Sequence, residues 1–220
     1  MKGLKGVPNP AKALNLDVKQ ALALSSLEEV GVLLRDIHVD YGNGFHGTSY
    51  INPHALLERA AVILRLAQDL LEVLELGSVI KREIQVVSGP VTGGAQLALI
   101  MAAFLDGWAG KKKGPIFHAP IHRVNGGFLI RDHYKKVLKG RRVLLADDVR
   151  HTGATFVQCH KLITDCGGEV IATTELYDRM SVLMELPVPN IALAQYRLEQ
   201  DLVPANDCVQ CKLKVPITRF

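Results

Sequence analysis

Residues 143–155 read Val143-Leu144-Leu145-Ala146-Asp147-Asp148-Val149-Arg150-His151-Thr152-Gly153-Ala154-Thr155, and this stretch decides the fold of the chain. It opens with a short apolar run, which predicts a parallel strand buried on both faces. Two adjacent carboxylates follow, and a Thr-Gly-Ala-Thr turn then leads into a helical pattern. The stretch therefore predicts a strand, a loop and the start of a helix.

The polar groups of this stretch suit a sugar phosphate. Backbone N–H groups and hydroxyls from Thr152 to Thr155 can surround a phosphate at the positive end of the helix dipole, and Gly153 permits close approach. Asp147 and Asp148 fall at the carboxyl end of the strand, where open α/β sheets bind ligands. Two carboxylates there suit vicinal ribose hydroxyls or a developing cation. The alternative is an ordinary strand-to-helix turn with an acidic cap.

The full pattern resembles the phosphoribosyl-diphosphate (PRPP) signature of the type I phosphoribosyltransferases. In that family the acidic pair holds the ribose and the following loop holds the 5′-phosphate. The resemblance implies an α/β, Rossmann-like fold with a mainly parallel twisted sheet flanked by helices and a small hood subdomain. It also makes Asp147 and Asp148 catalytic, and it implies a 5′-phosphate loop of Val149, Arg150, His151, Thr152, Gly153, Ala154 and Thr155.

The composition of the chain sets broad limits. Its 220 residues carry a formal net charge of +4 and four cysteines. This length fits one domain with a small accessory lobe, and the mild charge suits an anionic substrate without implying nucleic acid. The cysteines do not resemble a secreted disulfide framework, and neither a signal peptide nor a membrane-length apolar run is evident. We expect a cytoplasmic protein that binds neither membrane nor nucleic acid.

A second loop lies upstream of the signature. Ile84 to Val87 predict a buried strand, and Ser88 to Gly94 lead into a helix that starts near Ala95. A proline followed by glycines exposes N–H groups to an anion, although tight turns use the same residues for steric reasons alone. Orotate phosphoribosyltransferases carry a similar Pro-x-x-Gly-Gly loop that binds the diphosphate of PRPP. The resemblance assigns this role to Val91, Thr92, Gly93 and Gly94.

The segment between the two loops is less informative. Lys111 to Lys113 form a basic turn, residues 115–119 predict a strand, and residues 120–127 form a polar stretch that we expect to be flexible. In orotate phosphoribosyltransferases a mobile loop here closes over PRPP. The resemblance implies that this loop contains His122, Arg123 and Arg131, the first two of them catalytic. The usual loop lysines are missing. This departure leaves open whether the chain catalyses at a normal rate without them or needs a lysine supplied by a partner subunit.

His151 departs from the family pattern within the signature. Its ordinary pKa is about 6.5, so it could contact the base, act as a general base or donate to phosphate. We include it among the catalytic residues, with an exposed loop histidine of no function as the alternative.

Arg179 points to an acidic base. Leu176-Tyr177-Asp178-Arg179 follows a predicted strand, and a guanidinium fork suits a carboxylate better than a lysine does. By itself an Asp-Arg pair would be a surface ion pair of small effect. Orotate phosphoribosyltransferases carry an Asp-Arg pair here whose arginine holds the orotate carboxylate. The weaker resemblance of residues 47–50 to the hood of that family adds Ser49 and Tyr50 to the nucleobase site.

We expect three parts along the chain. Residues 1–52 form an N-terminal arm and hood, residues 53–200 the phosphoribosyltransferase core, and residues 201–220 a tail belonging to the hood. Within the first part we expect an irregular arm up to Leu16 and a helix from about Ser26 to Ile37. The tail contains Cys208-x-x-Cys211, and one such pair has too few ligands for a closed zinc site unless donors come from elsewhere. No protein ligand to a catalytic metal is expected.

The implied reaction transfers ribose 5-phosphate from PRPP to a nucleobase, most directly orotate, and releases diphosphate. Magnesium held by PRPP and water would be the cofactor, and by resemblance the chain would be a homodimer. One alternative is a purine or other nucleobase phosphoribosyltransferase, suggested by His151 and the altered loop. The other is a non-catalytic PRPP-sensing regulator, suggested by the missing lysines.

Overall fold

The computed structural model describes residues 10–29, 31–42, 44–76, 83–109, 114–179, 184–196 and 202–218. The basic turn at residues 111–113 lies outside these ranges, as do the first nine residues. None of the helices in the described ranges has the length and apolarity to cross a membrane.

A mainly parallel sheet forms the centre of the molecule, as predicted. Its strands follow the order β10-β9-β8-β5-β6-β7, and every neighbouring pair is parallel except β6 and β7. The strands are β5 (Val86–Pro90), β6 (Phe117–Val124), β7 (Gly127–Leu129), β8 (Arg142–Arg150), β9 (Glu169–Asp178) and β10 (Asn190–Gln195). Parallel pairing places the carboxyl ends of β5, β8 and β9 at one edge of the sheet, where Asp147 and Asp148 lie.

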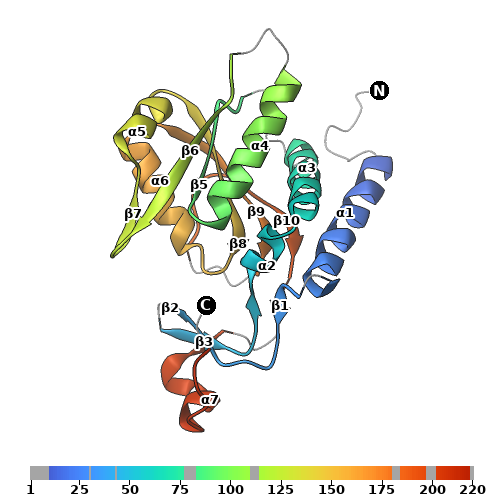
Figure 1. The fold of residues 1–220 in the computed structure, drawn as a ribbon, viewed down its shortest axis with the longest axis vertical. Helices are drawn as coiled ribbons and strands as arrows, with labels where there is room; N and C mark the ends of the chain where they lie inside the picture. Colours follow the sequence, from blue (N-terminus) through green and yellow to red (C-terminus); the bar gives the residue numbers. More distant parts are fainter. Residues whose placement is uncertain are drawn as a thin grey trace, which may run out of the picture.

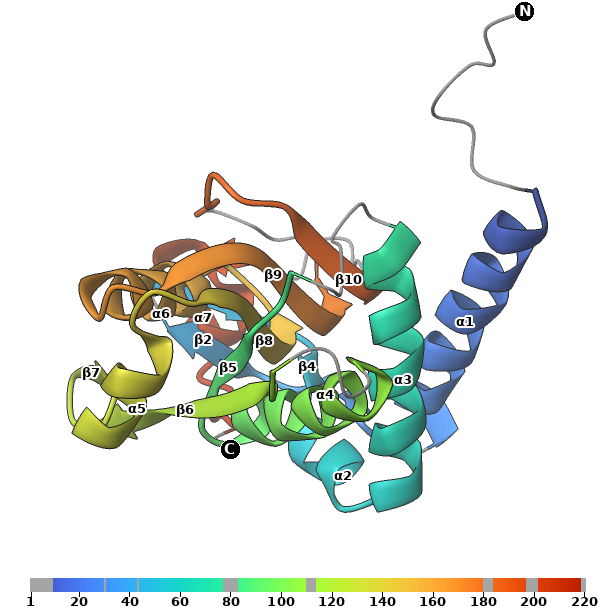
Figure 2. The same cartoon turned by 90° about the horizontal axis from the view of Figure 1, so that it is seen from above.

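Helices bury both faces of this sheet, which explains its continuous apolar strands. Alternate residues of one strand join different cores: Leu144 belongs to the larger core and Leu145 to the smaller. Helices α3 (Ala60–Leu76) and α4 (Gly93–Ala109) lie on the first face, and α5 (Asp132–Leu138) and α6 (Ala154–Asp165) on the second (Figures 1 and 2).

The N-terminal prediction is wrong. Residues 10–29 form helix α1 (Pro10–Glu29), so residues 10–16 of the expected irregular arm are helical. The helix expected from about Ser26 to Ile37 begins earlier and ends at Glu29. The hydroxyl of Ser26 donates to the Leu22 carbonyl at 2.9 Å, inside the helix, instead of capping its start. Ala23 and Leu27 are fully buried in the larger core, and the buried Tyr177 hydroxyl donates to the Ala23 carbonyl at 2.9 Å. Tertiary burial of these residues therefore decides the helix boundaries, and α1 packs on the core.

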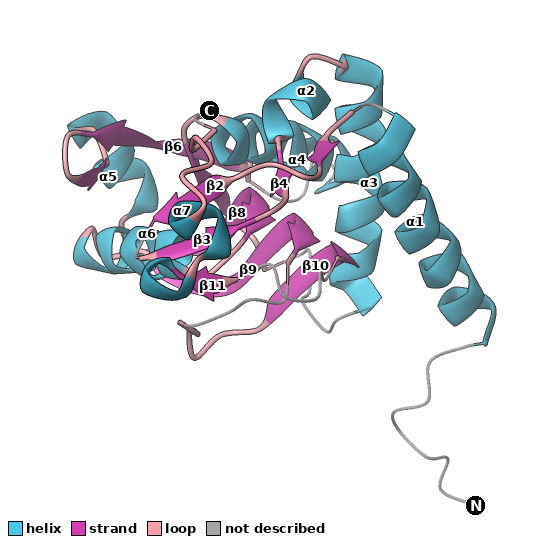
Figure 3. Cartoon of the chain, turned by 90° about the horizontal axis from the view of Figure 1, so that it is seen from below, coloured by secondary structure: helices cyan, strands magenta, loops and turns pink. Residues whose placement is uncertain are grey.

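A smaller lobe lies below the strand ends (Figure 1). This small lobe, residues 39–47 and 203–212, contains β2 (Val39–Gly42), β3 (Phe45–Gly47), β11 (Val203–Pro204), η1 (Ala205–Asp207) and α7 (Val209–Lys212). Strand β3 pairs with both β2 and β11, so the C-terminal tail completes the small sheet. Strands β1 (Leu33–Leu34) and β4 (Tyr50–Ile51) pair between the lobe and helix α2 (Pro53–Leu57). Figure 3 shows the lobe in front of β8 and β9.

The segment between the two expected loops is a β-hairpin. His122 and Arg123 pair with Leu129 and Phe128, and the turn between the strands has only Asn125 and Gly126. Gly126 adopts a φ of +86°, which suits glycine in such a turn. The prediction of a flexible polar loop at residues 120–127 is therefore wrong, because strand β6 continues past Pro120 and folds back on itself.

Candidate active site

The two acidic residues lie directly against the glycine turn that follows β5. A Cβ on Gly93 would lie 1.5 Å from Asp148 Oδ2, and a Cβ on Gly94 would lie 2.7 Å from Asp147 Oδ1. Any larger residue at either position would displace the carboxylates. The Val91–Thr92 peptide bond of this turn is cis. The sheet thus brings together two loops that are more than fifty residues apart in the sequence.

Enclosure makes both carboxyl groups harder to ionise. Burial raises the pKa of Asp148 to about 6. Burial, and then the charge of Asp148, raise the pKa of Asp147 well above its ordinary value. Asp147 is 9% exposed, and its Oδ1 accepts a hydrogen bond from the Asp148 N–H at 3.0 Å. Two adjacent acids in this environment gain from a cationic or hydroxyl-bearing ligand.

The turn after β8 ends at the positive end of helix α6. Gly153 precedes the helix with a φ of +86°, a left-handed conformation that glycine adopts without strain. The first backbone N–H groups of a helix have no partner inside it, so they can bind an anion. The Thr152 hydroxyl adds a further polar group, 3.5 Å from the Ala154 nitrogen.

Two adjoining pockets open over these groups. One, of about 450 Å³, is lined by Thr152 to Thr155, Asp147 and the hairpin residue Phe128. The other, of about 390 Å³, is lined by Pro90 to Gly93 and both acids. Asp147, Val149 and Thr155 line both pockets. The acid pair therefore lies beside two turns whose backbone N–H groups could bind anions.

Comparisons with known proteins agree with this geometry. The chain shares its fold with orotate phosphoribosyltransferase from Aeropyrum pernix (TM-score 0.59, 22% identity, 79% of this chain and 93% of that chain). It also superposes on adenine phosphoribosyltransferase from Rhodothermus marinus (TM-score 0.58, 20% identity, covering 80% of this chain and 99% of that chain). The chain has the type I phosphoribosyltransferase fold.

Curated sequences with this fold extend the comparison. The chain is 23% identical to orotate phosphoribosyltransferase of Thermotoga maritima over 193 residues, 86% of this chain and 92% of that protein. It is 27% identical to orotate phosphoribosyltransferase of Carboxydothermus hydrogenoformans over 185 residues, 83% and 87% respectively. No protein-family model matches the chain.

Arg179 lies beneath the small lobe in this phosphoribosyltransferase fold. Its guanidinium donates to the Tyr41 hydroxyl at 3.0 Å and to the Ser49 hydroxyl at 3.1 Å, and it lies 4.8 Å from the centre of the Tyr41 ring. Arg179 is 3% exposed and does not line either pocket described above. The structure thus brings Arg179 and Ser49 together, as the resemblance implied, and both contact Tyr41, which lines the larger pocket.

His151 lies between two tyrosines. Its ring stacks on Tyr50, with centroids 6.1 Å apart and planes 13° apart, and it lies 5.4 Å from Tyr41. Burial, and then the nearby Arg179 charge, lower the pKa of His151 to about 3. The imidazole is therefore neutral at pH 7, so it cannot supply a positive charge to a phosphate. It can still accept a hydrogen bond.

The cationic residues of the signature and the hairpin have different positions. The Arg150 guanidinium pairs with Asp178 at 2.9 Å, so Arg150 ties β8 to β9 as well as lining the larger pocket. His122 and Arg123 both line the pocket beside the glycine turn. Within the described residues, His122 Nε2 is buried without a hydrogen-bond partner. Arg131 is exposed before α5 and lines neither pocket.

Two pocket residues were missed by the sequence analysis. Tyr41 lines the larger pocket, and its hydroxyl donates to the Ser49 carbonyl. His54 lines the smaller pocket from helix α2, and its charge would lower the pKa of Asp148. The sequence feature that could have indicated Tyr41 is an aromatic residue within a turn-rich stretch. Nothing in the sequence except its residue type indicated His54. Both reach the site only because the N-terminal segment folds across the strand ends.

Proposed function

We propose that this protein transfers ribose 5-phosphate from PRPP to orotate, forming orotidine monophosphate and diphosphate in pyrimidine nucleotide biosynthesis. One observation carries the proposal: an acid pair packed against a glycine turn and a helix N-terminus within adjoining pockets. The orotate phosphoribosyltransferases that align with most of this chain support the choice of reaction.

The proposed assignment gives each turn one end of PRPP. The helix N-terminus at residues 152–155 holds the 5′-phosphate, and the turn at residues 91–94 holds the diphosphate. Asp147 and Asp148 then face the ribose between them. Fixing both ends of the substrate aligns the anomeric carbon with the incoming base, which lowers the entropic part of the barrier.

The reaction breaks the bond from the anomeric carbon to diphosphate and forms one to a ring nitrogen of the base, which loses its proton. Positive charge grows on the ribose as the diphosphate leaves. The neighbouring carboxylates stabilise that charge because they are already oriented and partly shielded from water. His122 and Arg123 line the pocket beside the glycine turn, where the departing diphosphate collects its negative charge. The proton lost by the base passes to solvent, because His151, with a pKa of about 3, is too weak a base to hold it.

A magnesium ion fits this arrangement. The pocket presents carboxylate oxygens, which magnesium prefers, but too few for a cage built from protein alone. Asp147 and Asp148 are the residues beside which it would be held, with diphosphate, ribose hydroxyls and water completing the shell. When bound, the ion would neutralise charge on the leaving diphosphate.

Arg179 favours orotate over purines in this proposal. Its fork suits a planar carboxylate, and the groups it now contacts, Ser49 and Tyr41, belong to the segment that crosses the site. Orotate binding would exchange one of these contacts for the base carboxylate. The homodimer and the cytoplasmic location stay predictions.

The experiment is a PRPP and magnesium titration followed by a panel of orotate, uracil, adenine, guanine and hypoxanthine. We expect turnover with orotate alone. Turnover with a purine and none with orotate would favour the purine alternative, since solved relatives of this fold include adenine phosphoribosyltransferases. PRPP binding with no turnover on any base would support the regulator instead.

A further inference from the structure

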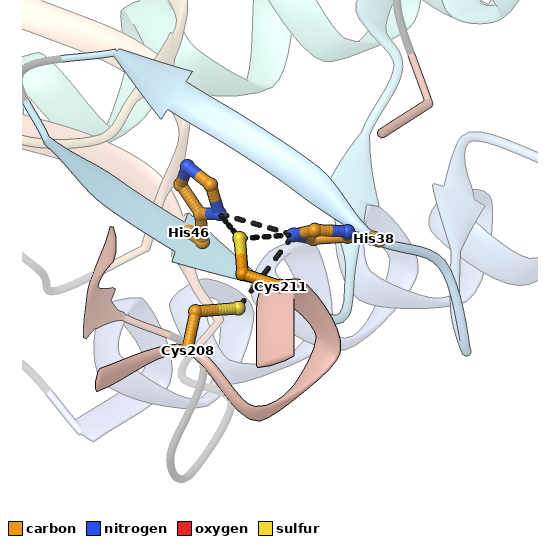
Figure 4. A group of neighbouring side chains, drawn as sticks. All are labelled: His38, His46, Cys208 and Cys211. Atoms are coloured by element: carbon orange, nitrogen blue, oxygen red, sulfur yellow. Dashed lines mark hydrogen bonds between the residues drawn. The ribbon is translucent and has the colours of Figure 1, made fainter. Parts of the chain in front are cut away.

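Four side chains of types that bind metals meet within and beside the small lobe (Figure 4), and none of them lines either pocket described above. His38 and His46 come from the segment that includes β2 and β3, whereas Cys208 and Cys211 come from the C-terminal tail and α7. His38, His46 and Cys208 are 2%, 7% and 5% exposed. The histidine pair and the cysteine pair are more than 160 positions apart in the sequence. Both cysteines are free thiols.

The spacing of the four ligand atoms is close to that of a tetrahedral metal site. His38 Nε2 lies 3.0 Å from His46 Nδ1, 3.6 Å from Cys208 Sγ and 3.5 Å from Cys211 Sγ. Cys211 Sγ lies 3.2 Å from His46 Nδ1, and all four atoms lie within 4.8 Å of one another. A tetrahedral zinc with bonds of about 2.0 Å to nitrogen and about 2.3 Å to sulfur requires edges of roughly 3.3 to 3.8 Å.

Groups around the histidines orient their rings. The other nitrogen of His38, Nδ1, lies 2.7 Å from the Val215 carbonyl. Donation to that carbonyl fixes the tautomer, leaving the Nε2 lone pair directed at the cluster. The outer nitrogen of His46, Nε2, lies 3.9 Å from Asp40 Oδ1. A carbonyl and a carboxylate behind the ligands are the usual companions of metal-bound histidines.

We propose that His38, His46, Cys208 and Cys211 bind one zinc ion, which fastens the C-terminal tail to strands β2 and β3. Two thiolates balance the double charge of the ion, and two imidazoles complete a closed Cys2His2 set with no open position for substrate. Such a closed set is typical of structural zinc. The sequence showed only the cysteine pair, and the structure supplies the two missing donors.

The ion would also hold the segment that covers the nucleobase site. Tyr41 and Ser49, which contact Arg179, lie within a few residues of His38 and His46 along the same strands and turns. Without metal, the tail is held to the histidine-bearing segment by the short pairing of β11 with β3 and by a few hydrogen bonds. In one of these, the Thr218 N–H donates to the His38 carbonyl. Metal loss should therefore weaken orotate binding more than PRPP binding.

The test measures metal content of the full-length protein directly. We expect one zinc per chain by elemental analysis, and cobalt exchange should give the visible bands of tetrahedral Co²⁺ with a thiolate charge-transfer band. Cys208→Ser and Cys211→Ser should each lose stoichiometric metal and the charge-transfer band. Cys166→Ser, which alters a cysteine at the end of α6 outside the cluster, should keep both.

Thermal unfolding provides a second readout that does not depend on activity. Removing zinc with a chelator should lower the midpoint of the wild-type protein, and zinc should restore it, because the ion binds only the folded state. The cysteine variants should not respond to either treatment. Absence of bound zinc and cobalt in protein with verified reduced thiols would overturn the proposal, as would a Cys208–Cys211 disulfide in freshly isolated protein. These outcomes leave the transfer reaction untouched, since it is measured separately.

Discussion

Asp148 shows how one residue can be costly to the fold and necessary to the site. Its carboxylate lies against Gly93, in a pocket that raises its pKa to about 6. If this side chain served packing alone, asparagine would give a more stable protein, because an amide of the same shape has no charge to bury. Retaining the carboxylate makes sense if a developing positive charge on the ribose must be stabilised.

Replacing Asp148 by asparagine should lower turnover with orotate by about a hundredfold, because removing one preorganised charged group costs on the order of 3 kcal/mol. The measurement is kcat under saturating PRPP, with circular dichroism to show that the fold is intact. Unchanged turnover in the folded variant would remove the assigned role.

The same substitution should change the dependence of stability on pH. An unfolded aspartic acid ionises near pH 4, whereas folded Asp148 ionises at about 6. Between these values the folded state holds more protons than the unfolded state, so its free energy of unfolding falls as the pH rises. Without ligands, Asp148→Asn should therefore be more stable than wild type at pH 7 and close to it at pH 4. Equal differences at both pH values would contradict the raised pKa.

Arg179 permits a test of base recognition at one residue. Arg179→Lys keeps the positive charge but loses the fork, so we expect the KM for orotate to rise about tenfold to a hundredfold with little change in the KM for PRPP. Arg141→Lys is the control, because Arg141 lies at the opposite end of β8 over the Phe117 ring. A parallel rise in both KM values would indicate general damage to the site.

At the scale of elements, the site depends on how closely β5 and the turn after it approach the end of β8. The contact is made by glycine backbone: a Cβ on Gly89 would lie 2.4 Å from the Gly94 carbonyl oxygen and 2.5 Å from that of Ala146. Parallel pairing of β5 with β8 sets this approach. Glycine at positions 89, 93 and 94 therefore permits this close approach, which a side chain would prevent.

Gly93→Ala should reduce turnover by about a hundredfold or more, because the new methyl group must displace the Asp148 carboxylate, and a shift of about 1 Å can cost this much. Gly107→Ala in the same helix is the matched control, since its Cβ meets nothing within 4 Å. It should be neutral or stabilise the protein by up to about 1 kcal/mol. Wild-type kcat in Gly93→Ala would show that the two turns are not coupled in this way.

At the scale of the whole molecule, helix α1 connects the N-terminal segment to the catalytic sheet. Leu27 is 1% exposed within the larger core, and the Ala23 carbonyl accepts the hydrogen bond of the buried Tyr177. Tyr177 lies on β9, two residues before Arg179. The helix thus belongs to the same core that positions the end of β9.

Leu27→Ala should reduce the free energy of unfolding by about 2–5 kcal/mol, the usual cost of a cavity in a packed core. Turnover of the folded fraction should stay at the wild-type value, because Leu27 contacts neither pocket turn. Leu22→Ala, 44% exposed on the same helix, should cost about 0.5 kcal/mol or less. Similar losses in both variants, measured by urea unfolding, would show that α1 is not part of the core.

The parts that the sequence by itself determined are those governed by neighbouring residues. An apolar run, two acids and a glycine turn predicted the end of β8 and the start of α6, and the same reasoning located the turn after β5. Local backbone preferences and burial on both faces fix such elements. The parallel sheet was confirmed, and the shared fold of solved phosphoribosyltransferases agrees with it.

Only the tertiary structure decided which distant residues meet. The N-terminal helix, the hairpin at β6 and β7, and the contact of Tyr41 with Arg179 depend on packing that no local pattern encodes. The four ligands of the proposed zinc site are the clearest case, since two histidines near residue 40 carry no signal until the tail folds back beside them. Contacts across the fold are set by strand order and core packing, and these arise only when the whole chain is folded.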